Sequence, residues 1–266
     1  ISTHLSSGLA TWVPRIQHAD QVYWIEATAG SGKTQLALKL LQDAAALQQR
    51  ARYVCFNRPL ADHLQTLAPS HAEVTTFHQL CRDHAERAGL ALDFGTDGVF
   101  KDMEHRFVQA ADTLPQLLDL LVIDESQDFD MAWVQALSAQ LKPDGRLYVL
   151  GDSHQQLYER EPFELPHAVR MVCTDNFRSP QKVVHALNQL QLTVQRIEAC
   201  SAHEGQTPGF HTHDDKAGSH DKALNHCLQD LWAAGFAPKQ VVVLSFRGVK
   251  NSRVLTMSQL GGHSTR

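Results

Sequence analysis

Short apolar runs rich in β-branched residues alternate with amphipathic segments along the first 150 residues. The runs are 22–27 (VYWIEA), 52–56 (RYVCF), 118–124 (LDLLVID) and 146–152 (RLYVLGD). Between the first two lies segment 33–49, whose leucines recur at helical spacing with few helix breakers. Buried strands that alternate with helices are typical of a parallel sheet covered on both faces. The pattern therefore predicts an α/β fold for this part of the chain.

A second set of elements follows a polar, proline-containing stretch at 158–167. Here the pattern predicts strands at 170–174 and 239–246 and helices at 179–190 and 220–235. We therefore place a domain boundary in this stretch. The expected division is a first lobe at 1–165, with a short insertion at about 83–117, and a second, partial lobe at 166–266.

Charge and cysteine content narrow the class of protein. The net charge is -5 over 266 residues, which argues against a large, strongly basic surface that wraps duplex DNA but permits a local basic groove. No run approaches the ~20 apolar residues of a membrane helix, so we expect no membrane partner. Five cysteines without a C-x-x-C pair indicate reduced thiols and a cytoplasmic location. Nothing in the sequence specifies an oligomeric state.

The most specific chemical signal is ATAGSGKT at 27–34, between a predicted strand and a predicted helix. Such a phosphate loop brings backbone N–H groups close to a triphosphate, and its glycines remove the steric obstacle of a Cβ atom. We expect Lys33 to reach the β- and γ-phosphates of ATP and the Thr34 hydroxyl to hold Mg²⁺. The alternative is a glycine-rich turn with an incidental lysine. The predicted phosphate-binding residues are Ala29, Gly30, Ser31, Gly32, Lys33 and Thr34.

Two acidic residues, Asp124 and Glu125, end the apolar run at 118–124. Carboxylates at the end of a buried strand are costly unless they manage a cation or a proton. Together with a phosphate loop, this predicts that Asp124 binds Mg²⁺ through water and that Glu125 polarises the attacking water. The alternative, a surface acidic pair that caps the next helix, is disfavoured by the upstream phosphate loop.

Several further motifs occur in a characteristic order: TFH at 76–78, DESQD at 124–128, GDSHQQLY at 151–158, NFRS at 176–179 and VVVLSFRG at 241–248. With the phosphate loop they resemble the motifs of superfamily 1 helicases of the UvrD/Rep type. The resemblance spans residues 27–248. It implies a RecA-like P-loop NTPase fold, with a parallel sheet flanked by helices and a partial second RecA-like lobe.

The resemblance also implies roles for individual residues. Gln155 would sense the γ-phosphate, and Arg178 would contact it from the second lobe as an arginine finger; otherwise Arg178 forms a surface salt bridge. Phe177 would stack on adenine or would be an ordinary core aromatic. Phe77 is either a nucleic-acid contact or a buried core ring, and His78 either a contact or a backbone partner. The implied contacts with single-stranded nucleic acid, DNA in particular, are Asn57, Arg58, Thr76, Phe77 and His78.

The chain departs from the family pattern in three places. No tryptophan follows Tyr158, the insertions are short, and no candidate for the last two family motifs is present. We therefore expect ATP binding with weak or no hydrolysis by this chain. In the full-length protein, ATP hydrolysis would drive movement on single-stranded nucleic acid. The alternative is an ATP-dependent switch that binds nucleic acid or a partner without unwinding, and a small-molecule kinase ranks last.

Overall fold

The computed structural model describes residues 8–90, 92–152, 165–193, 195–214, 216, 218–245 and 251–264. The chain divides into two compact units, Ile1–Thr207 and Pro208–Arg266. The expected boundary at 165/166 remains a prediction. The first strand after that point joins the sheet of the first unit.

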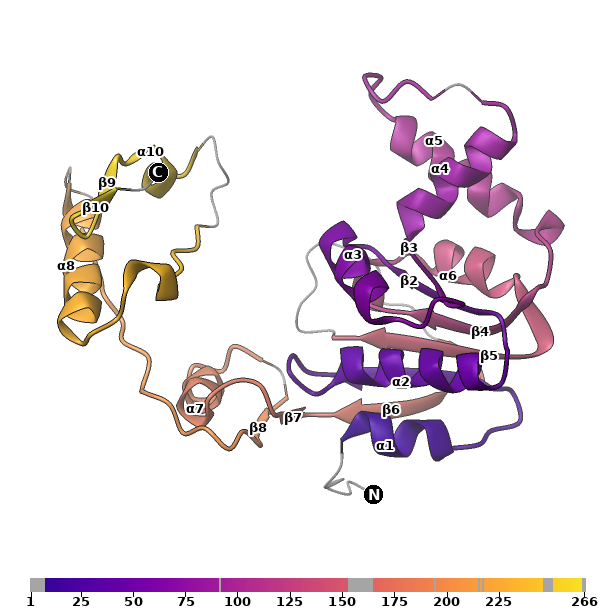
Figure 1. Cartoon of the computed structure of the whole chain (residues 1–266), viewed down its shortest axis with the longest axis horizontal. Helices are drawn as coiled ribbons and strands as arrows, with labels where there is room; N and C mark the ends of the chain where they lie inside the picture. The colour runs from indigo at the N-terminus through magenta and orange to yellow at the C-terminus, as the bar shows by residue number, and fades with distance from the viewer. Residues whose placement is uncertain are drawn as a thin grey trace. The chain divides into compact units, whose positions relative to one another are not determined.

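The first unit is built on one parallel sheet of six strands in the order β3-β2-β4-β5-β1-β6 (Figure 1). The strands are β1 Val22–Ala27, β2 Ala51–Cys55, β3 Glu73–Thr76, β4 Leu118–Ile123, β5 Leu141–Gly151 and β6 Val169–Cys173. The sheet flanked by helices is the α/β fold expected from the sequence. The strand β5 pairs with both β1 and β4, so the ends of the phosphate-loop strand and the acidic strand lie on either side of it.

Alternation along the strands sends side chains into two hydrophobic cores. On one face, Tyr23 and Ile25 of β1 pack with Leu36 and Leu40 of α2 (Lys33–Ala46). That core also includes α1 (Leu9–Trp12), η1 (Val13–Arg15) and α3 (Arg58–Leu67). The helices α4 (Phe77–Arg87), α5 (Val99–Gln109) and α6 (Met131–Ser138) contribute to the core on the other face. Because helices cover both faces, the buried parts of the central strands β1, β4 and β5 are mostly apolar, as the sequence pattern indicated.

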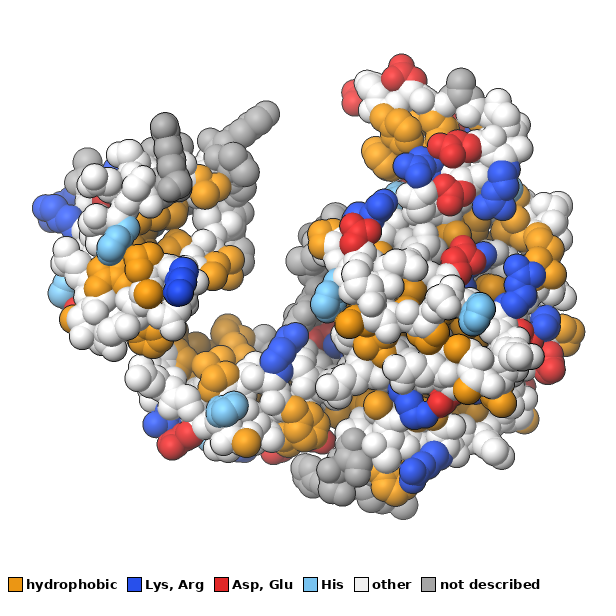
Figure 2. Space-filling model, viewed as in Figure 1, with side chains coloured by type: hydrophobic (Ala, Val, Ile, Leu, Met, Phe, Trp, Pro, Cys, Tyr) orange, Lys and Arg blue, Asp and Glu red, His pale blue; other side chains and the backbone are white. Residues whose placement is uncertain are grey.

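The short insertion predicted at 83–117 contains the end of α4, all of α5 and the 3₁₀ turn η2 (Ala111–Thr113). Met103 and Phe107 on the inner face of α5 are buried in the second core, which anchors the insertion to the sheet. On the visible face, Lys and Arg side chains are interspersed with Asp and Glu side chains (Figure 2). This mixture fits the small net charge.

After β6 the chain forms a small two-stranded pair, β7 (Asp175–Asn176) with β8 (Glu198–Ala199), and helix α7 (Gln181–Gln189). The second unit holds α8 (Ser219–Ala233), η5 (Pro238–Gln240), α10 (Arg253–Thr256) and the hairpin β9 (Gln259–Leu260) with β10 (His263–Ser264). The strand predicted at 239–246 does not form in the described part: 238–240 is a 3₁₀ turn and 241–245 has no regular structure. Strand-like composition alone does not make a strand without a paired neighbour.

Among the described helices, none has the length and apolar character required to cross a lipid bilayer. All five cysteines are free thiols, and Cys55 and Cys81 are buried.

Candidate active site

The phosphate loop connects β1 to α2 at the carboxyl edge of the sheet. Gly30 and Gly32 have φ values of 75° and 97°, which a side chain would disfavour. Gly32 precedes the first residue of α2, and its carbonyl accepts the Leu36 N–H at 2.9 Å. The loop thus ends at a helix N-terminus, where free N–H groups and the helix dipole favour an anion.

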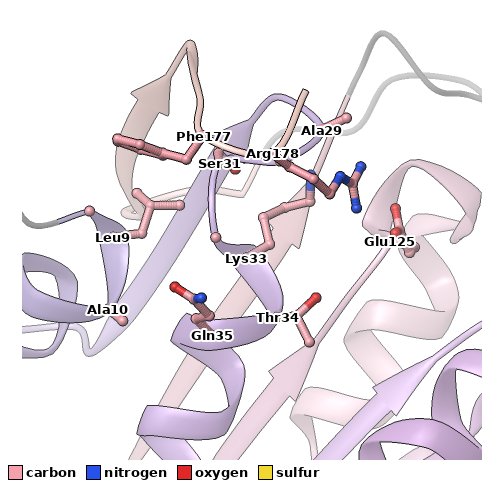
Figure 3. Close-up of a pocket in the computed structure, with 13 residues that line it drawn as sticks. Leu9, Ala10, Ala29, Ser31, Lys33, Thr34, Gln35, Glu125, Phe177 and Arg178 are labelled. Atoms are coloured by element: carbon pink, nitrogen blue, oxygen red, sulfur yellow. The ribbon is translucent and has the colours of Figure 1, made fainter. Parts of the chain in front are cut away.

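A cavity of about 610 Å³ opens over this loop (Figure 3). It is lined by Gly8, Leu9, Ala10, Ala29, Gly30, Ser31, Gly32, Lys33, Thr34, Gln35, Glu125, Phe177 and Arg178. All six predicted phosphate-loop residues are among them. Segments more than 160 residues apart in the sequence therefore meet at one cavity, and its polar side chains converge on the phosphate loop.

The Lys33 ammonium lies back against its own loop. Nζ donates to the carbonyl oxygen of Ala27 at 2.6 Å and to that of Thr28 at 3.4 Å. It also lies 3.9 Å from Oδ2 of Asp152, a buried carboxylate just after β5. The positive charge is thus held in place at the floor of the cavity.

The Ser31 hydroxyl indicates that the loop is built for a polar ligand. Ser31 is 2% exposed, and its Oγ has no hydrogen-bond partner in the part of the chain that the structure describes. Buried hydroxyls are nearly always paired, because leaving one unpaired costs about 1–3 kcal/mol. A phosphate oxygen in the loop would supply the missing partner.

Asp124 stands just past the end of β4 and is buried. Its Oδ2 accepts the Tyr53 hydroxyl at 2.7 Å, and its Oδ1 accepts the Glu125 N–H at 2.9 Å. Burial, reinforced by the Glu125 carboxylate, raises the pKa of Asp124 from 3.8 to about 6, and the Lys33 ammonium opposes this shift. The structure therefore brings Lys33 and Asp124 into the same electrostatic site.

A bound divalent cation would fit this arrangement. Each Asp124 oxygen keeps a lone pair beyond its one hydrogen bond, and a cation offsets the cost of burying the carboxylate. The Thr34 hydroxyl points to the side of the phosphate loop that faces Glu125 (Figure 3). Hydroxyl and carboxylate oxygens are the donors that Mg²⁺ prefers. The residues present thus fit the predicted Mg²⁺.

Glu125 lines the cavity from a strained turn. It has φ 53° and ψ 45°, a left-handed conformation that costs about 1 kcal/mol for a residue with a side chain. Its Oε2 accepts the Gln127 amide at 2.7 Å. The oxygen of the same amide accepts the Asp152 N–H at 3.0 Å. Gln127 therefore ties the Glu125 carboxylate to the end of β5.

The loop after β7 closes one side of the cavity. The Phe177 N–H donates to the Gly30 carbonyl at 3.0 Å, and Asn176 Oδ1 accepts the N–H of Arg178 at 3.1 Å. A Cβ added to Gly30 would lie 2.8 Å from Asn176 Oδ1 and 2.9 Å from Arg178 Cβ. The two loops thus require glycine at this contact. Figure 3 shows the Arg178 guanidinium reaching toward the Glu125 side of the cavity and the Phe177 ring on the other side.

A family model described as an AAA domain matches residues 13–161, more than half of the chain. The chain belongs to this AAA domain family. The match includes the phosphate loop, Asp124 and Glu125, whereas Phe177 and Arg178 lie beyond it. No curated protein matches the chain.

Two solved structures have a distant likeness to the AAA domain chain. The arterivirus nonstructural protein 10 helicase, solved with DNA, is 15% identical with a TM-score of 0.40; the match covers 72% of this chain and 46% of that one. The Sulfolobus solfataricus SWI2/SNF2 ATPase core, solved with double-stranded DNA, is 14% identical with a TM-score of 0.31; the match covers 52% and 30%. The chain thus spans less than half the length of either protein.

The structure corrects the alternative in which Phe77 contacts nucleic acid. Phe77 is 0% exposed, and its ring stacks on Trp133 at 4.3 Å between centroids within the second core. Phe77 is buried because it lies on the inward face of α4. The Phe77 ring is therefore a core aromatic of the AAA domain chain.

The other predicted nucleic-acid contacts lie at the carboxyl ends of β2 and β3. Asn57 and Thr76 cap α3 and α4, because their side-chain oxygens accept the N–H groups of Leu60 and Gln79. The half-buried His78 pairs with Glu104 at 2.9 Å. Arg58 is exposed and pairs with Asp62 on its own helix. Of this set, Asn57 and Arg58 are exposed, His78 is half-buried and Thr76 is buried.

Gln155 lies outside the described residues. Three residues near the site have contacts for which the sequence predicts no role: Tyr53, Gln127 and Asp152. Asp152 could have been found from the sequence, because it follows a predicted strand in the same way as Asp124 does. The contact between Tyr53 and Asp124 could not, because it depends on the pairing of β2 with β4.

Proposed function

We propose that this chain is the ATP-binding core of a superfamily 1 motor of the UvrD/Rep type, which couples ATP hydrolysis to movement on single-stranded nucleic acid, DNA in particular. The observation that carries the proposal is the meeting of Lys33, Thr34, Glu125 and Arg178 at one cavity over a glycine-bend phosphate loop. A simple anion site would not need an acidic side chain in its wall.

The roles of the residues follow from their positions. The loop N–H groups and Ser31 Oγ would hold the phosphates, and Lys33 would leave its own carbonyl partners for the β- and γ-oxygens. Thr34 and Asp124 would hold Mg²⁺, which neutralises phosphate charge. Glu125, oriented by Gln127, would accept a proton from the attacking water.

Arg178 would stabilise the negative charge that develops on the phosphates. In the family that the sequence resembles, the corresponding arginine belongs to a second lobe. Here it belongs to the same compact unit as the phosphate loop and is held there by the Phe177 bond to Gly30. Arg178 would therefore be in place before any closure between lobes.

An ATP-dependent switch that clamps nucleic acid or a partner without unwinding is the second candidate. The observation that favours it is the burial of Phe77 and the use of Asn57 and Thr76 as helix caps, which leaves few side chains at that edge for gripping a strand. A strand-displacement assay on the full-length protein separates the two. Clamping that depends on ATP without displacement supports the switch.

The motor proposal is tested by ATP turnover with Mg²⁺, with and without single-stranded DNA. We expect slow turnover by this chain and faster turnover when the strand is added. In calorimetry, Lys33→Ala should weaken ATP binding at least tenfold, because a charged hydrogen bond contributes about 1.5–3 kcal/mol. Unchanged affinity in this variant contradicts the phosphate assignment.

A further inference from the structure

Tyr53 brings a hydroxyl into a hydrophobic core. It lies in the middle of β2, is 0% exposed, and belongs to the same core as Leu36 and Leu40 of α2. A phenylalanine would fill nearly the same volume without any polar atom. Because a buried hydroxyl is costly unless it is paired, the group that pairs with Tyr53 indicates what this residue contributes.

The hydroxyl of Tyr53 is paired with the Asp124 carboxylate. It donates to Oδ2 at 2.7 Å, since an ionised carboxylate only accepts, and this is the short distance of a charge-assisted bond. In the register of β2 with β4, Tyr53 stands opposite Val122, two residues before Asp124. The Asp124 N–H also donates to the Val54 carbonyl at 2.8 Å. Strand β2 therefore holds both the backbone and the side chain of Asp124.

The two oxygens of Asp124 are each fixed by one hydrogen bond. Oδ1 accepts the Glu125 N–H at 2.9 Å, and Oδ2 accepts the Tyr53 hydroxyl. The last torsion of an aspartate side chain is intrinsically broad, so the Glu125 contact alone would let Oδ2 swing. The Tyr53 hydroxyl removes this freedom and still leaves each oxygen a lone pair for the water shell of a cation.

We infer that Tyr53 is a positioning residue of the Mg²⁺ site, whose hydroxyl orients the Asp124 carboxylate toward the hydrated cation. The inference rests on the proposed function, because it adds a residue to the Mg²⁺ site of that function. Tyr53 acts through Asp124 and is not itself a ligand. Removing a hydrogen-bond partner that orients a metal ligand lowers metal affinity by about 10–100-fold.

The first test compares Tyr53→Phe with the parent, since this change keeps the ring and fills the core. The β,γ-imido analogue of ATP is titrated by calorimetry with Mg²⁺ and with excess EDTA, in slightly alkaline buffer where Asp124 is ionised. Mg²⁺ should tighten binding by the parent, and most of that gain should be lost in Tyr53→Phe. With EDTA the two proteins should agree within about twofold, because the phosphate loop is unchanged.

The second test measures the affinity for the cation itself. Mn²⁺ is titrated into the complex of protein and analogue, and its free concentration is followed by electron paramagnetic resonance. Carboxylates and water bind Mn²⁺ as they bind Mg²⁺. The dissociation constant of Mn²⁺ should rise about tenfold or more in Tyr53→Phe.

Tyr23→Phe is the matched control. Tyr23 is 1% exposed in the same core, and its hydroxyl accepts the His18 N–H at 3.2 Å, so this variant also removes one buried hydroxyl. It should leave the Mn²⁺ affinity unchanged. In an Asp124→Asn background, Tyr53→Phe should have no further effect on Mn²⁺ affinity, because no carboxylate remains to be oriented.

The outcomes that overturn the inference are distinct from failure of the proposed function. Equal Mn²⁺ affinities in Tyr53→Phe and the parent overturn it and leave the phosphate site intact. A loss of analogue binding that is as large with EDTA as with Mg²⁺ overturns it as well, because the hydroxyl would then have a structural role alone. A further loss in the Asp124→Asn background does the same. If Mg²⁺ does not change analogue binding by the parent, the Mg²⁺ site of the proposed function fails, and the inference fails with it.

Discussion

Asp124 is a carboxylate that the fold keeps away from water. It is 2% exposed, and its partners in the described chain are the Tyr53 hydroxyl and one backbone N–H. Its pKa of about 6 lies above the usual 3.8, so the folded protein binds a proton there more tightly than the unfolded chain does. The ionised form of Asp124 therefore opposes folding when no cation is bound.

The raised pKa predicts the direction in which the free energy of unfolding changes with pH in Mg²⁺-free buffer. Between pH 4 and pH 6 the folded state retains the Asp124 proton longer, so this residue lowers the free energy of unfolding as pH rises through that window. Asp124→Asn removes the titration. Above pH 6 the variant should exceed the parent in the free energy of unfolding by on the order of 3 kcal/mol, and the difference should vanish near pH 4.

Urea unfolding at a series of pH values measures this difference. Asp119→Asn is the control, because the Lys142 ammonium beside Asp119 lowers its pKa, so that variant should not gain stability as pH rises. A pH-independent difference between Asp124→Asn and the parent would exclude a raised pKa at this position.

Glu125→Gln tests the proton-accepting role. The amide keeps the size of the side chain and an oxygen that accepts from Gln127, but it no longer takes up a proton from water. We expect turnover to fall by about 10²–10⁴-fold with ATP affinity preserved. Single-turnover hydrolysis and calorimetry on the same sample check the two parts. Equal losses in the Gln135→Glu control, an exposed position on α6, would point to a general effect of substitution.

At the residue scale, the sequence predicts which residues form the phosphate site better than it predicts which residues are buried. The phosphate loop and the Asp124–Glu125 pair are contiguous motifs, and the structure brings them together. Phe77 was ambiguous, because an aromatic residue at the start of an amphipathic helix faces in or out according to how that helix is rotated. The Tyr53 contact with Asp124 depends on strand pairing, which no local pattern encodes.

At the element scale, two loops from distant parts of the sequence meet at one side of the cavity. The phosphate loop and the loop after β7 approach so closely at Gly30 that a methyl group would contact Asn176 and Arg178. We predict that Gly30→Ala pushes the loop after β7 away and weakens ATP binding by about tenfold or more, since it displaces both Phe177 and Arg178.

Gly98→Ala is a matched control for this substitution. Gly98 also has a positive φ, of 89°, but a Cβ there meets nothing within 4 Å. Both variants should lose about 1 kcal/mol of stability from backbone strain, whereas ATP affinity should fall in Gly30→Ala alone. Calorimetry and thermal unfolding of the two proteins measure both effects. Similar ATP affinities in the two variants would argue against a functional contact between the loops.

Five of the six parallel strands of the first unit were predicted, because each contains a short apolar run, whereas β3 (Glu73–Thr76), with the sequence EVTT, was not. The order of the strands was not, since strand order comes from packing between elements far apart in the sequence. The segment 239–246 was predicted as a strand from its apolar pattern and from the likeness of 241–248 to a strand of the family. In the structure Val242 and Leu244 are 79% and 82% exposed, with no strand paired to them among the described residues.

For the whole molecule, the important feature is the division at Thr207/Pro208. Every described residue that lines the cavity lies within the first unit. The segment 202–214 forms no helix or strand and is largely exposed, which is typical of protease-sensitive connections. We predict that limited proteolysis cuts there and that the fragment ending near 207 binds ATP within about twofold of the intact chain. A tenfold loss would show that the second unit contributes to the site.

The hydrogen bond from the Asp152 N–H to the Gln127 side chain has one more consequence. At the end of β5 this amide proton is held by a side chain that also holds Glu125, so its exchange with deuterated solvent depends on whether the acidic turn is ordered. The exchange rate of this one amide, measured by mass spectrometry or NMR, would then report how often the acidic turn opens. A ligand that binds the neighbouring carboxylates and orders the turn would slow this exchange.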